Sequence, residues 1–282
     1  MDLIELSRLI TIYVGCFCLF VGICGNSINI FVFSTMKNSK KISSIFYFLI
    51  GSIINLIYIL INLISRIVSS ITEYDLTRSS SVWCKIRQCC LATLCGIGLS
   101  CCCLSAMDQY LRTSNKYLLR RLSDIQWAHR FIVISLIVWC IHGILPLIAF
   151  DILPVSKTCG FISANWNIYG LVYFLGLITS IPVLIMIVFT YLTHRNIHKT
   201  IVLANQRADR QLRRMIFIEI VLVIIGFLPY GINSAYSLLT SNIAKDRNQL
   251  EKEYFLLTIV SLFPYIYYAV RESLQTRNFN LK

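Results

Sequence analysis

The chain has 282 residues, of which 57% are hydrophobic and only 14% are charged. An average soluble domain carries about 25% charged residues, so this composition argues against a soluble fold and indicates a membrane protein. The formal net charge of +13 does not indicate a nucleic-acid partner, because the Lys and Arg residues fall between apolar runs rather than on one soluble face.

Seven apolar runs are long enough to cross a bilayer as helices. The third run has 19 residues without Asp, Glu, Lys or Arg. As a helix it would be roughly 28 Å long, about the thickness of the hydrocarbon core. The connections are too short to hold a folded domain, so the sequence predicts an all-α membrane protein with a seven-helix bundle over residues 9–270. The predicted spans are 9–33, 42–64, 89–107, 131–150, 168–192, 215–239 and 254–270.

The distribution of positive charge predicts the orientation of the bundle. Seventeen of the 26 Lys and Arg residues lie in the first, third and fifth connections and in the tail. The positive-inside rule therefore places residues 1–8 outside the plasma membrane and residues 271–282 in the cytoplasm. No A-x-A-like cleavage site follows the first run, which we expect to be retained as a span. The apolar and basic residues of the tail predict a short interfacial helix. The Lys and Arg residues of the connection 195–214 predict contact with anionic lipids or with a cytoplasmic partner.

The cysteines do not indicate a metal site or a disulfide-rich scaffold. Ten of the 12 lie inside apolar runs, where cysteine behaves as a small hydrophobic residue. Cys84 and Cys159 are the two in polar connections, both on the predicted outer side, where a disulfide can persist. No CxxC pair has a second pair to complete a zinc site, and no glycine-rich nucleotide motif is present. We therefore expect that the protein binds no metal and no cofactor and that it is not an enzyme.

Each predicted span, or its outer end, carries a short motif. In chain order the motifs are Gly25-Asn26; Ser52-Ile53-Ile54-Asn55-Leu56; Cys84 with Asp108-Gln109-Tyr110; Trp139 with Pro146; Pro182 with Tyr191; Gly226-Phe227-Leu228-Pro229; and Phe263-Pro264-Tyr265-Ile266-Tyr267. With seven spans and an outer N-terminus, this series resembles the rhodopsin-like (class A) G-protein-coupled receptors over nearly the whole chain. The matching family motifs include GN, LAxxDL, DRY, CWxP and NPxxY.

The resemblance implies a receptor that binds an extracellular small molecule or short peptide in the helix-bundle cavity. Ligand binding would open the cytoplasmic face to a heterotrimeric G protein, at a coupling end that includes Asp108, Gln109, Tyr110 and Tyr267. The resemblance also implies a disulfide between Cys84 and Cys159, which would tie the third span to the loop between the fourth and fifth spans.

Four departures from the family pattern indicate a divergent receptor of an orphan or chemosensory lineage. Gln109 replaces the Arg of DRY and cannot form its charge-assisted pair. Asn55 replaces an Asp that helps to hold sodium, Phe227 replaces a Trp and Phe263 replaces an Asn. Because of Gln109, a second interpretation stays open, in which the chain is a receptor-like protein that binds a partner and couples weakly or not at all to a G protein. A transporter or channel is less favoured, because the chain has no internal repeat and few intramembrane charges.

Several residues inside the spans have two interpretations each. Asn26 and Asn55 are buried amides that, with Tyr267, form either a switching cluster or static contacts between helices. Pro182, Pro229 and Pro264 kink their helices, and Pro229 is either the hinge of the sixth span or a fixed bend. Trp139 and Phe227 are expected to pack inside the bundle.

Glu219 is a carboxylate about one turn inside the sixth span, where a charge is costly. It either reaches water near Arg213 or Arg214, or it contacts the Gln109–Tyr110 end of the third span or Tyr267 and so holds a closed state. The second interpretation predicts that Glu219→Gln raises basal signalling.

Polar residues near the outer ends of the spans either line a ligand pocket or extend to the membrane interface. Leu91 occupies the position at which amine receptors carry Asp, and Leu257 that at which opsins carry the retinal Lys, so neither ligand is expected. Two arginines of the set would suit an acidic group on the ligand. The predicted pocket residues are Arg66, Arg87, Gln88, Leu91, Tyr230, Asn233 and Glu253.

Overall fold

The computed structural model describes residues 3–35, 42–154, 157–199, 206–240, 243 and 245–279, with the backbone alone for 197–199, 206–215 and 272–279. Seven helical stretches within these residues are long and apolar enough to cross a membrane, which confirms the predicted bundle. Each contains one predicted apolar run to within one residue. The stretches are Leu3–Thr35, Ser43–Thr72, Ser81–Thr113, Ile125–Ala149, Ala164–Asn196, Ile216–Leu239 and Arg247–Arg271.

Four of the seven spans are divided into shorter segments. In chain order the elements are α1 (Leu3–Thr35), α2 (Ser43–Tyr58), η1 (Ile59–Leu63), α3 (Ile64–Thr72), α4 (Leu76–Ser79), α5 (Ser81–Thr113), α6 (Tyr117–Arg121), α7 (Ile125–His142), α8 (Ile144–Ala149), β1 (Phe150–Ile152), β2 (Cys159–Phe161), α9 (Ala164–Leu171), η2 (Val172–Ser180), α10 (Ile181–Lys199), α11 (Gln206–Leu239), α12 (Arg247–Val260) and α13 (Phe263–Phe279). The segments η1 and η2 are π-helical.

Two of the divisions lie next to prolines. Pro182 follows η2, where the side chains of Thr179 and Ser180 donate hydrogen bonds to carbonyls five residues earlier, at 2.8 and 2.6 Å. Pro264 lies in the first turn of α13, where the missing proline N–H leaves no helical hydrogen bond unmade. Pro229 lies inside α11, which continues through it as a helix. The hinge role of Pro229 therefore stays a prediction.

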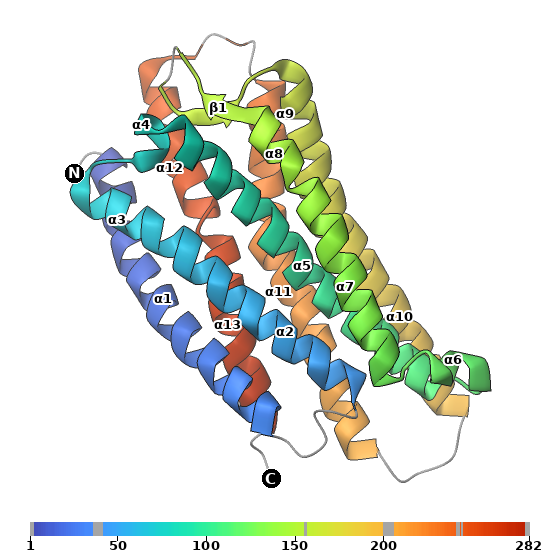
Figure 1. The fold of residues 1–282 in the computed structure, drawn as a ribbon. Helices are drawn as coiled ribbons and strands as arrows, with labels where there is room; N and C mark the ends of the chain where they lie inside the picture. The colour runs from blue at the N-terminus through green and yellow to red at the C-terminus, as the bar shows by residue number, and fades with distance from the viewer. Residues whose placement is uncertain are drawn as a thin grey trace.

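The long helix α5 forms the centre of the bundle (Figure 1) and packs against α2, α7, α8 and α10. Glycine allows one of these contacts to be close, because a Cβ on Gly96 would lie 2.2 Å from the ring of Trp139 in α7. The Trp139 Nε1–H also donates a hydrogen bond to Ser100 Oγ at 2.8 Å. Trp139 therefore packs inside the bundle and locks α7 onto α5.

The two ends of the bundle differ in structure. One end carries α4 and the β1–β2 hairpin, and the other carries α6 (Figure 1). We call them the disulfide end, after Cys84 and Cys159, and the α6 end. Helix α1 starts at the disulfide end, and α13 runs toward the α6 end (Figure 1). Residues 271–279, where a short interfacial helix is predicted, are helical and continue α13 without a break.

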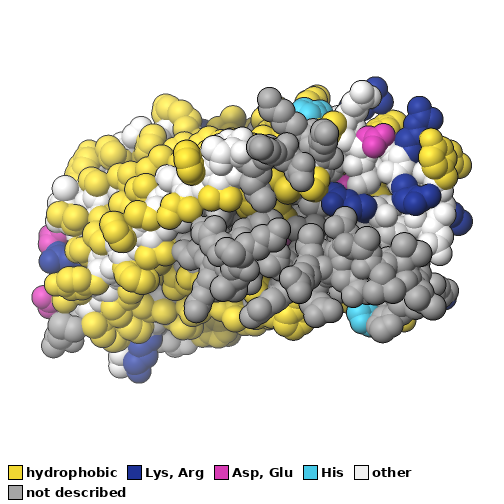
Figure 2. Space-filling model, turned by 90° about the horizontal axis from the view of Figure 1, so that it is seen from below, with side chains coloured by type: hydrophobic (Ala, Val, Ile, Leu, Met, Phe, Trp, Pro, Cys, Tyr) yellow, Lys and Arg dark blue, Asp and Glu magenta, His cyan; other side chains and the backbone are white. Residues whose placement is uncertain are grey.

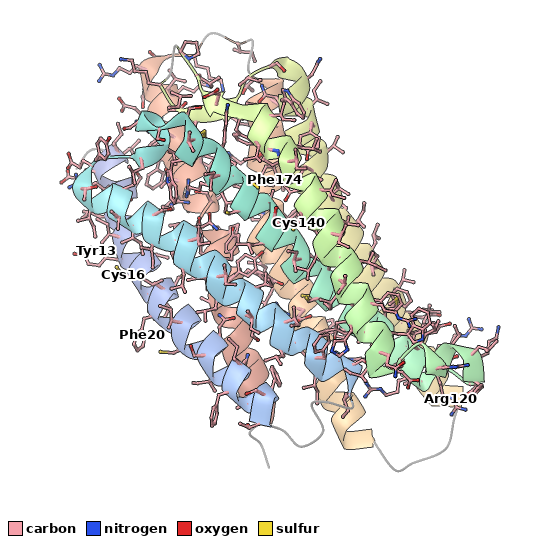
Figure 3. The ribbon with its side chains drawn as sticks, in the orientation of Figure 1. Tyr13, Cys16, Phe20, Arg120, Cys140 and Phe174 are labelled. Atoms are coloured by element: carbon pink, nitrogen blue, oxygen red, sulfur yellow. A yellow bond between two sulfur atoms is a disulfide. The ribbon has the colours of Figure 1, made fainter. Side chains whose placement is uncertain are left out.

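The outer faces of the helices are apolar, as a lipid-facing surface requires. Tyr13 and Phe20 project outward from α1 (Figure 3) and are 72% and 71% exposed. The α6 end has a more polar surface, and Lys and Arg side chains gather on one side of it (Figure 2). Exposed basic residues here are Lys116, Arg120 and Arg121 of the α5–α7 connection and Arg130 of α7.

Candidate functional site

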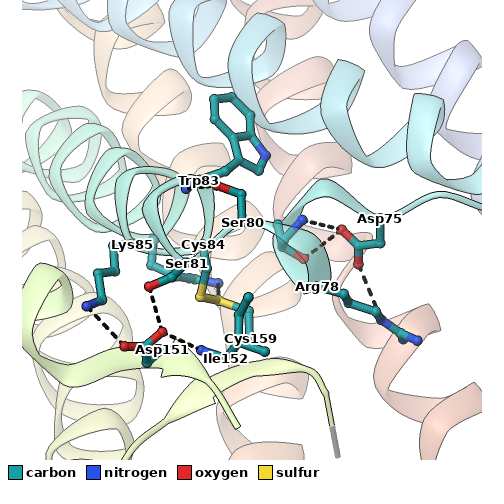
Figure 4. The surroundings of a disulfide bond; sticks show 12 residues. Asp75, Arg78, Ser80, Ser81, Trp83, Cys84, Lys85, Asp151, Ile152 and Cys159 are labelled. Carbon is teal, nitrogen blue, oxygen red and sulfur yellow. Dashed lines mark hydrogen bonds and ion pairs between the residues drawn. A yellow bond between two sulfur atoms is a disulfide. The ribbon is translucent and has the colours of Figure 1, made fainter. Parts of the chain in front are cut away.

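A disulfide between Cys84 and Cys159 joins the first turn of α5 to β2 (Figure 4), which confirms the expected pairing. The bond links positions 75 residues apart, with the two Cα atoms 5.7 Å apart. Cross-links of this kind commonly stabilise a fold by about 2–4 kcal/mol. The disulfide therefore holds the hairpin over the end of the third span.

Asp151 in β1 fixes the same hairpin through polar contacts to α5 (Figure 4). Its carboxylate accepts hydrogen bonds from Ser81 Oγ and from the Ile152 N–H, both at 2.7 Å, and pairs with Lys85 Nζ at 3.1 Å. These interactions, that from Ser81 foremost, lower the pKa of Asp151 to about 2, so the group is charged at neutral pH. The hairpin is thus seated by a disulfide and by an ionic contact.

A cavity of about 200 Å³ lies inside the disulfide end of the bundle, with Phe150 of β1 and Phe161 of β2 in its wall. Five of the seven predicted pocket residues line it, namely Arg66, Arg87, Gln88, Leu91 and Tyr230. The wall is otherwise mostly aromatic. Its further residues are Tyr58, Ala92, Cys95, Pro146, Phe150, Phe161, Tyr169, Tyr173, Phe174, Phe227, Ser261, Pro264 and Tyr265.

Asn233 and Glu253 do not line this cavity. Glu253 instead pairs with Lys245 Nζ at 2.6 Å and accepts a hydrogen bond from Tyr236 at 3.0 Å. Because Lys245 lies in the connection after the sixth span, which ends at Leu239, hydropathy alone could not show that it neutralises Glu253.

Four tyrosines of the cavity wall were not among the predicted pocket residues, namely Tyr58, Tyr169, Tyr173 and Tyr265. They lie in apolar runs, where nothing in the sequence distinguishes a ring that faces the cavity from one that faces lipid. The weak signal that could have identified them is that each is a tyrosine within a span, because a buried hydroxyl needs a partner. Tyr173 meets this need by donating to Ala92 O at 3.2 Å.

At the α6 end, the residues of the Asp108-Gln109-Tyr110 motif face three different environments. Asp108 is 2% exposed and accepts hydrogen bonds from Ser44 Oγ at 2.5 Å, from Arg112 at 2.8 Å and from Ser123 Oγ. It therefore ties α5 to α2 and to the connection before α7.

Gln109 is 6% exposed, and its Nε2 has no hydrogen-bond partner among the described residues. The ring of Tyr110 packs on Phe189 of α10, with centroids 5.6 Å apart. In place of an acid paired with the Arg that follows it, the motif here has separate contacts of Asp108 and Tyr110 and the enclosed amide of Gln109.

Glu219 of α11 pairs with Arg271 of α13, with Oε1 and Nε 3.0 Å apart. Both side chains are buried, at 2% and 1% exposure. This partner was in neither interpretation of Glu219 from the sequence, because Arg271 was assigned to the cytoplasmic tail. A buried Glu–Arg pair thus joins the sixth and seventh spans.

Tyr267 lies between the cavity and this ion pair. Its hydroxyl is 3.6 Å from Cys102 Sγ of α5, and its ring makes a T-shaped contact with Phe227 at 5.3 Å. Tyr267 precedes Arg271 by four residues, or about one turn, in α13. Because Phe227 lines the cavity and Arg271 follows Tyr267 by one turn of α13, the Phe227–Tyr267 contact connects the cavity wall to the helix that carries the buried pair.

The other predicted residues inside the bundle are buried at helix–helix contacts. Asn26 donates to Gly22 O at 2.7 Å, and Asn55 Oδ1 lies against Gly98 of α5. Pro182 is buried, and its carbonyl lies 3.8 Å from Cys103 Sγ. These positions fit either a switching or a static role, so both remain open. Among the described residues, no group of His, Cys, Asp or Glu is arranged to hold a metal ion.

Comparison with known proteins agrees with this geometry. The family described as 7 transmembrane receptor (rhodopsin family) matches residues 25–267, from the first span to the seventh. No curated protein matches the chain. Receptors of this family are multi-pass membrane proteins and generally not enzymes. The match, the seven spans and the disulfide together show that the chain belongs to the rhodopsin-like (class A) family of G-protein-coupled receptors.

Proposed function

We propose that this protein is a plasma-membrane receptor whose disulfide end faces the outside. It binds an extracellular small molecule or short peptide in the cavity and activates a heterotrimeric G protein by opening its α6 end. The observation that carries this proposal is the contact between Phe227 of the cavity wall and Tyr267, on the same two helices that the Glu219–Arg271 pair joins. A ligand that moves Phe227 acts on the packing around that pair.

The buried pair supplies a closing contact that Gln109 cannot supply. Removing one partner of a buried ion pair costs about 3–5 kcal/mol, because the other charge is left uncompensated. The pair therefore holds α11 against α13 in the closed state. Separation of these helices would let the inner part of α11 move outward and would expose a docking surface for the G protein.

The exposed basic residues of the α5–α7 connection support a membrane-facing and partner-facing role for the α6 end. Arg120 projects from α6 away from the bundle (Figure 3). Each Lys or Arg near an anionic leaflet contributes about 1 kcal/mol of attraction. These residues are placed to contact anionic lipids and to border the surface on which the G protein would dock.

Gln109 supports a second candidate, a receptor-like protein that binds a partner and couples weakly or not at all. Its enclosed amide has no hydrogen-bond partner among the described residues and carries no charge with which to meet a G protein. The two functions differ in what happens when an arginine is restored at this position.

The test compares wild type and Gln109→Arg at matched surface expression, with calcium and cAMP readouts and a promiscuous G protein. Receptor function predicts a wild-type signal above that of mock-transfected cells and a larger signal from Gln109→Arg. Silence of both proteins in every readout would favour the partner-binding function. Ion or solute flux without any G-protein signal would indicate a transporter or channel instead.

A further inference from the structure

We infer that the ligand of the cavity presents a carboxylate to Arg66 and Arg87 and packs an apolar body against the aromatic wall. This inference rests on the proposed function, because it names the chemistry that the receptor would detect. Four observations carry it: the charge of the cavity wall, the pairing of the nearby acids, the contacts of the two arginines and the size of the space.

The described wall of the cavity carries two arginines and no Asp or Glu. Five acidic side chains around the disulfide end are paired with other cations, and two further described acids there, Glu5 and Asp246, are not in the cavity wall. Salt bridges join Glu73 to Arg8, Asp75 to Arg78, Asp151 to Lys85, Glu251 to Arg247 and Glu253 to Lys245. No described acid of this chain therefore forms a salt bridge with Arg66 or Arg87, and a ligand with a negative charge would complete the site.

The guanidinium of Arg66 is held in place by the break in the seventh span. It donates to Ser261 O at 3.2 Å and to Thr258 O at 2.9 Å, and it lies 5.9 Å from the ring centroid of Tyr265. These acceptors are neutral carbonyls, so they orient the group without cancelling its charge. A preoriented guanidinium suits a carboxylate, which accepts two parallel N–H donors.

Arg87 adds an unsatisfied donor to the same wall. Its Nε is enclosed and has no hydrogen-bond partner among the described residues. An enclosed charged donor without an acceptor is costly, and an incoming carboxylate oxygen removes that cost. Gln88, the next residue of the wall, has its Nε2 4.0 Å from Cys159 Sγ, so this part of the wall lies close to the disulfide.

The size and composition of the cavity define the rest of the ligand. Ligand pockets usually measure about 300–1,000 Å³, so a space of about 200 Å³ admits a compact molecule or the end of a longer one. Aromatic rings surround this space, Phe174 and Tyr230 among them in T-shaped contact at 4.8 Å. A cationic amine would meet two like charges and no acid there. A small amphipathic acid and the free C-terminus of a short peptide share the required chemistry.

The test measures binding without any signalling step. The purified full-length receptor is heated with a thiol-reactive dye, because buried free cysteines such as Cys95 and Cys102 become accessible on unfolding. The probes are octanoate, benzoate, 3-phenylpropionate and indole-3-acetate, each beside its primary amide, at constant chloride and ionic strength. We expect the best acid to raise the melting temperature by roughly 3 °C or more at saturation, and its amide to raise it little.

Arg66→Gln and Arg87→Gln should each weaken the binding of that acid by roughly 10- to 100-fold. Arg247→Gln is the matched control, because it removes the same charge from a side chain that is 91% exposed and outside the cavity. The arginine variants are used only if they retain the melting transition of the free receptor to within a few degrees; otherwise Arg66→Lys and Arg87→Lys replace them.

Short peptides with free and amidated C-termini separate the two sources of the carboxylate. Stabilisation by free-ended peptides but not by small acids assigns the carboxylate to a peptide ligand. The inference is overturned if no acid or free-ended peptide shifts the melting temperature, if amides act as strongly as acids, or if the arginine variants bind like the control. A receptor that binds acids but never activates a G protein would retain this inference and would contradict the proposed function.

Discussion

At the residue scale, the buried Glu219–Arg271 pair is the most informative feature of the bundle. Two charges inside a membrane protein are expensive unless each compensates the other. Here the pair lies between α11 and α13 at almost zero exposure. Its guanidinium also lies against Gly51 of α2, where an added Cβ would meet Nη2 at 3.4 Å. One interaction thus contacts the second, sixth and seventh spans together.

The pair predicts a non-additive effect of mutations on stability. Glu219→Leu and Arg271→Met should each lower the free energy of unfolding by about 3–5 kcal/mol, because each removes one partner of a buried ion pair. The double variant should recover most of that loss, since no charge is left to compensate. Melting temperatures of the three purified variants measure the coupling.

A suitable control for this cycle is the pair of Arg247 and Glu251, which is 91% and 29% exposed. Removal of either exposed partner should change stability by at most about 1 kcal/mol. If the losses at Glu219 and Arg271 simply add, the two charges do not compensate each other.

At the element scale, the contact between α5 and α7 depends on the absence of a side chain. A Cβ on Gly96 would lie 2.2 Å from Trp139 Cδ2, and the indole is already held by its hydrogen bond to Ser100. A methyl group added at Gly96 would therefore force α5 and α7 apart. The fourth span is the least buried of the seven, so this contact is a large part of its attachment.

Gly96→Ala should accordingly destabilise the receptor by roughly 1–3 kcal/mol, the usual cost of overpacking. The matched control is Gly176→Ala in η2, where an added Cβ would meet Val172 Cγ1 at an ordinary contact distance of 3.9 Å. Thermal unfolding of both variants should show a lower melting temperature for Gly96→Ala alone. Equal melting temperatures would mean that α7 is free to shift on α5.

At the scale of the whole molecule, the lengths of the apolar runs predicted the seven spans, because a bilayer requires a similar length and apolarity of every helix that crosses it. The cysteine pair was predictable for a similar reason, since only Cys84 and Cys159 lie outside the apolar runs. Residue-level contacts were harder to predict. Glu219 and Arg271 are 52 positions apart in sequence, and only the packing of α11 on α13 brings them together.

The cavity was predictable in part. Residues at the outer ends of spans were identified from their polarity, and five of seven line the space. Glu253 was misplaced because its neutralising partner, Lys245, lies in the connection before α12. The aromatic wall was not predicted, since the rotation of each helix about its own axis decides which ring faces inward. The contact of Phe227 with Tyr267, one turn before Arg271 in α13, nevertheless connects the cavity wall to the helix of the buried pair.

The proposed coupling between the ion pair and the G protein is tested most directly by guanine-nucleotide exchange on a purified heterotrimeric G protein. Wild type, Glu219→Gln and the control Glu251→Gln are compared in lipid nanodiscs at equal amounts of folded receptor. The neutral amide weakens the hold on Arg271, so Glu219→Gln should raise basal exchange several-fold while Glu251→Gln matches wild type. Exchange by Glu219→Gln at the wild-type rate would contradict a closing role for the Glu219–Arg271 pair.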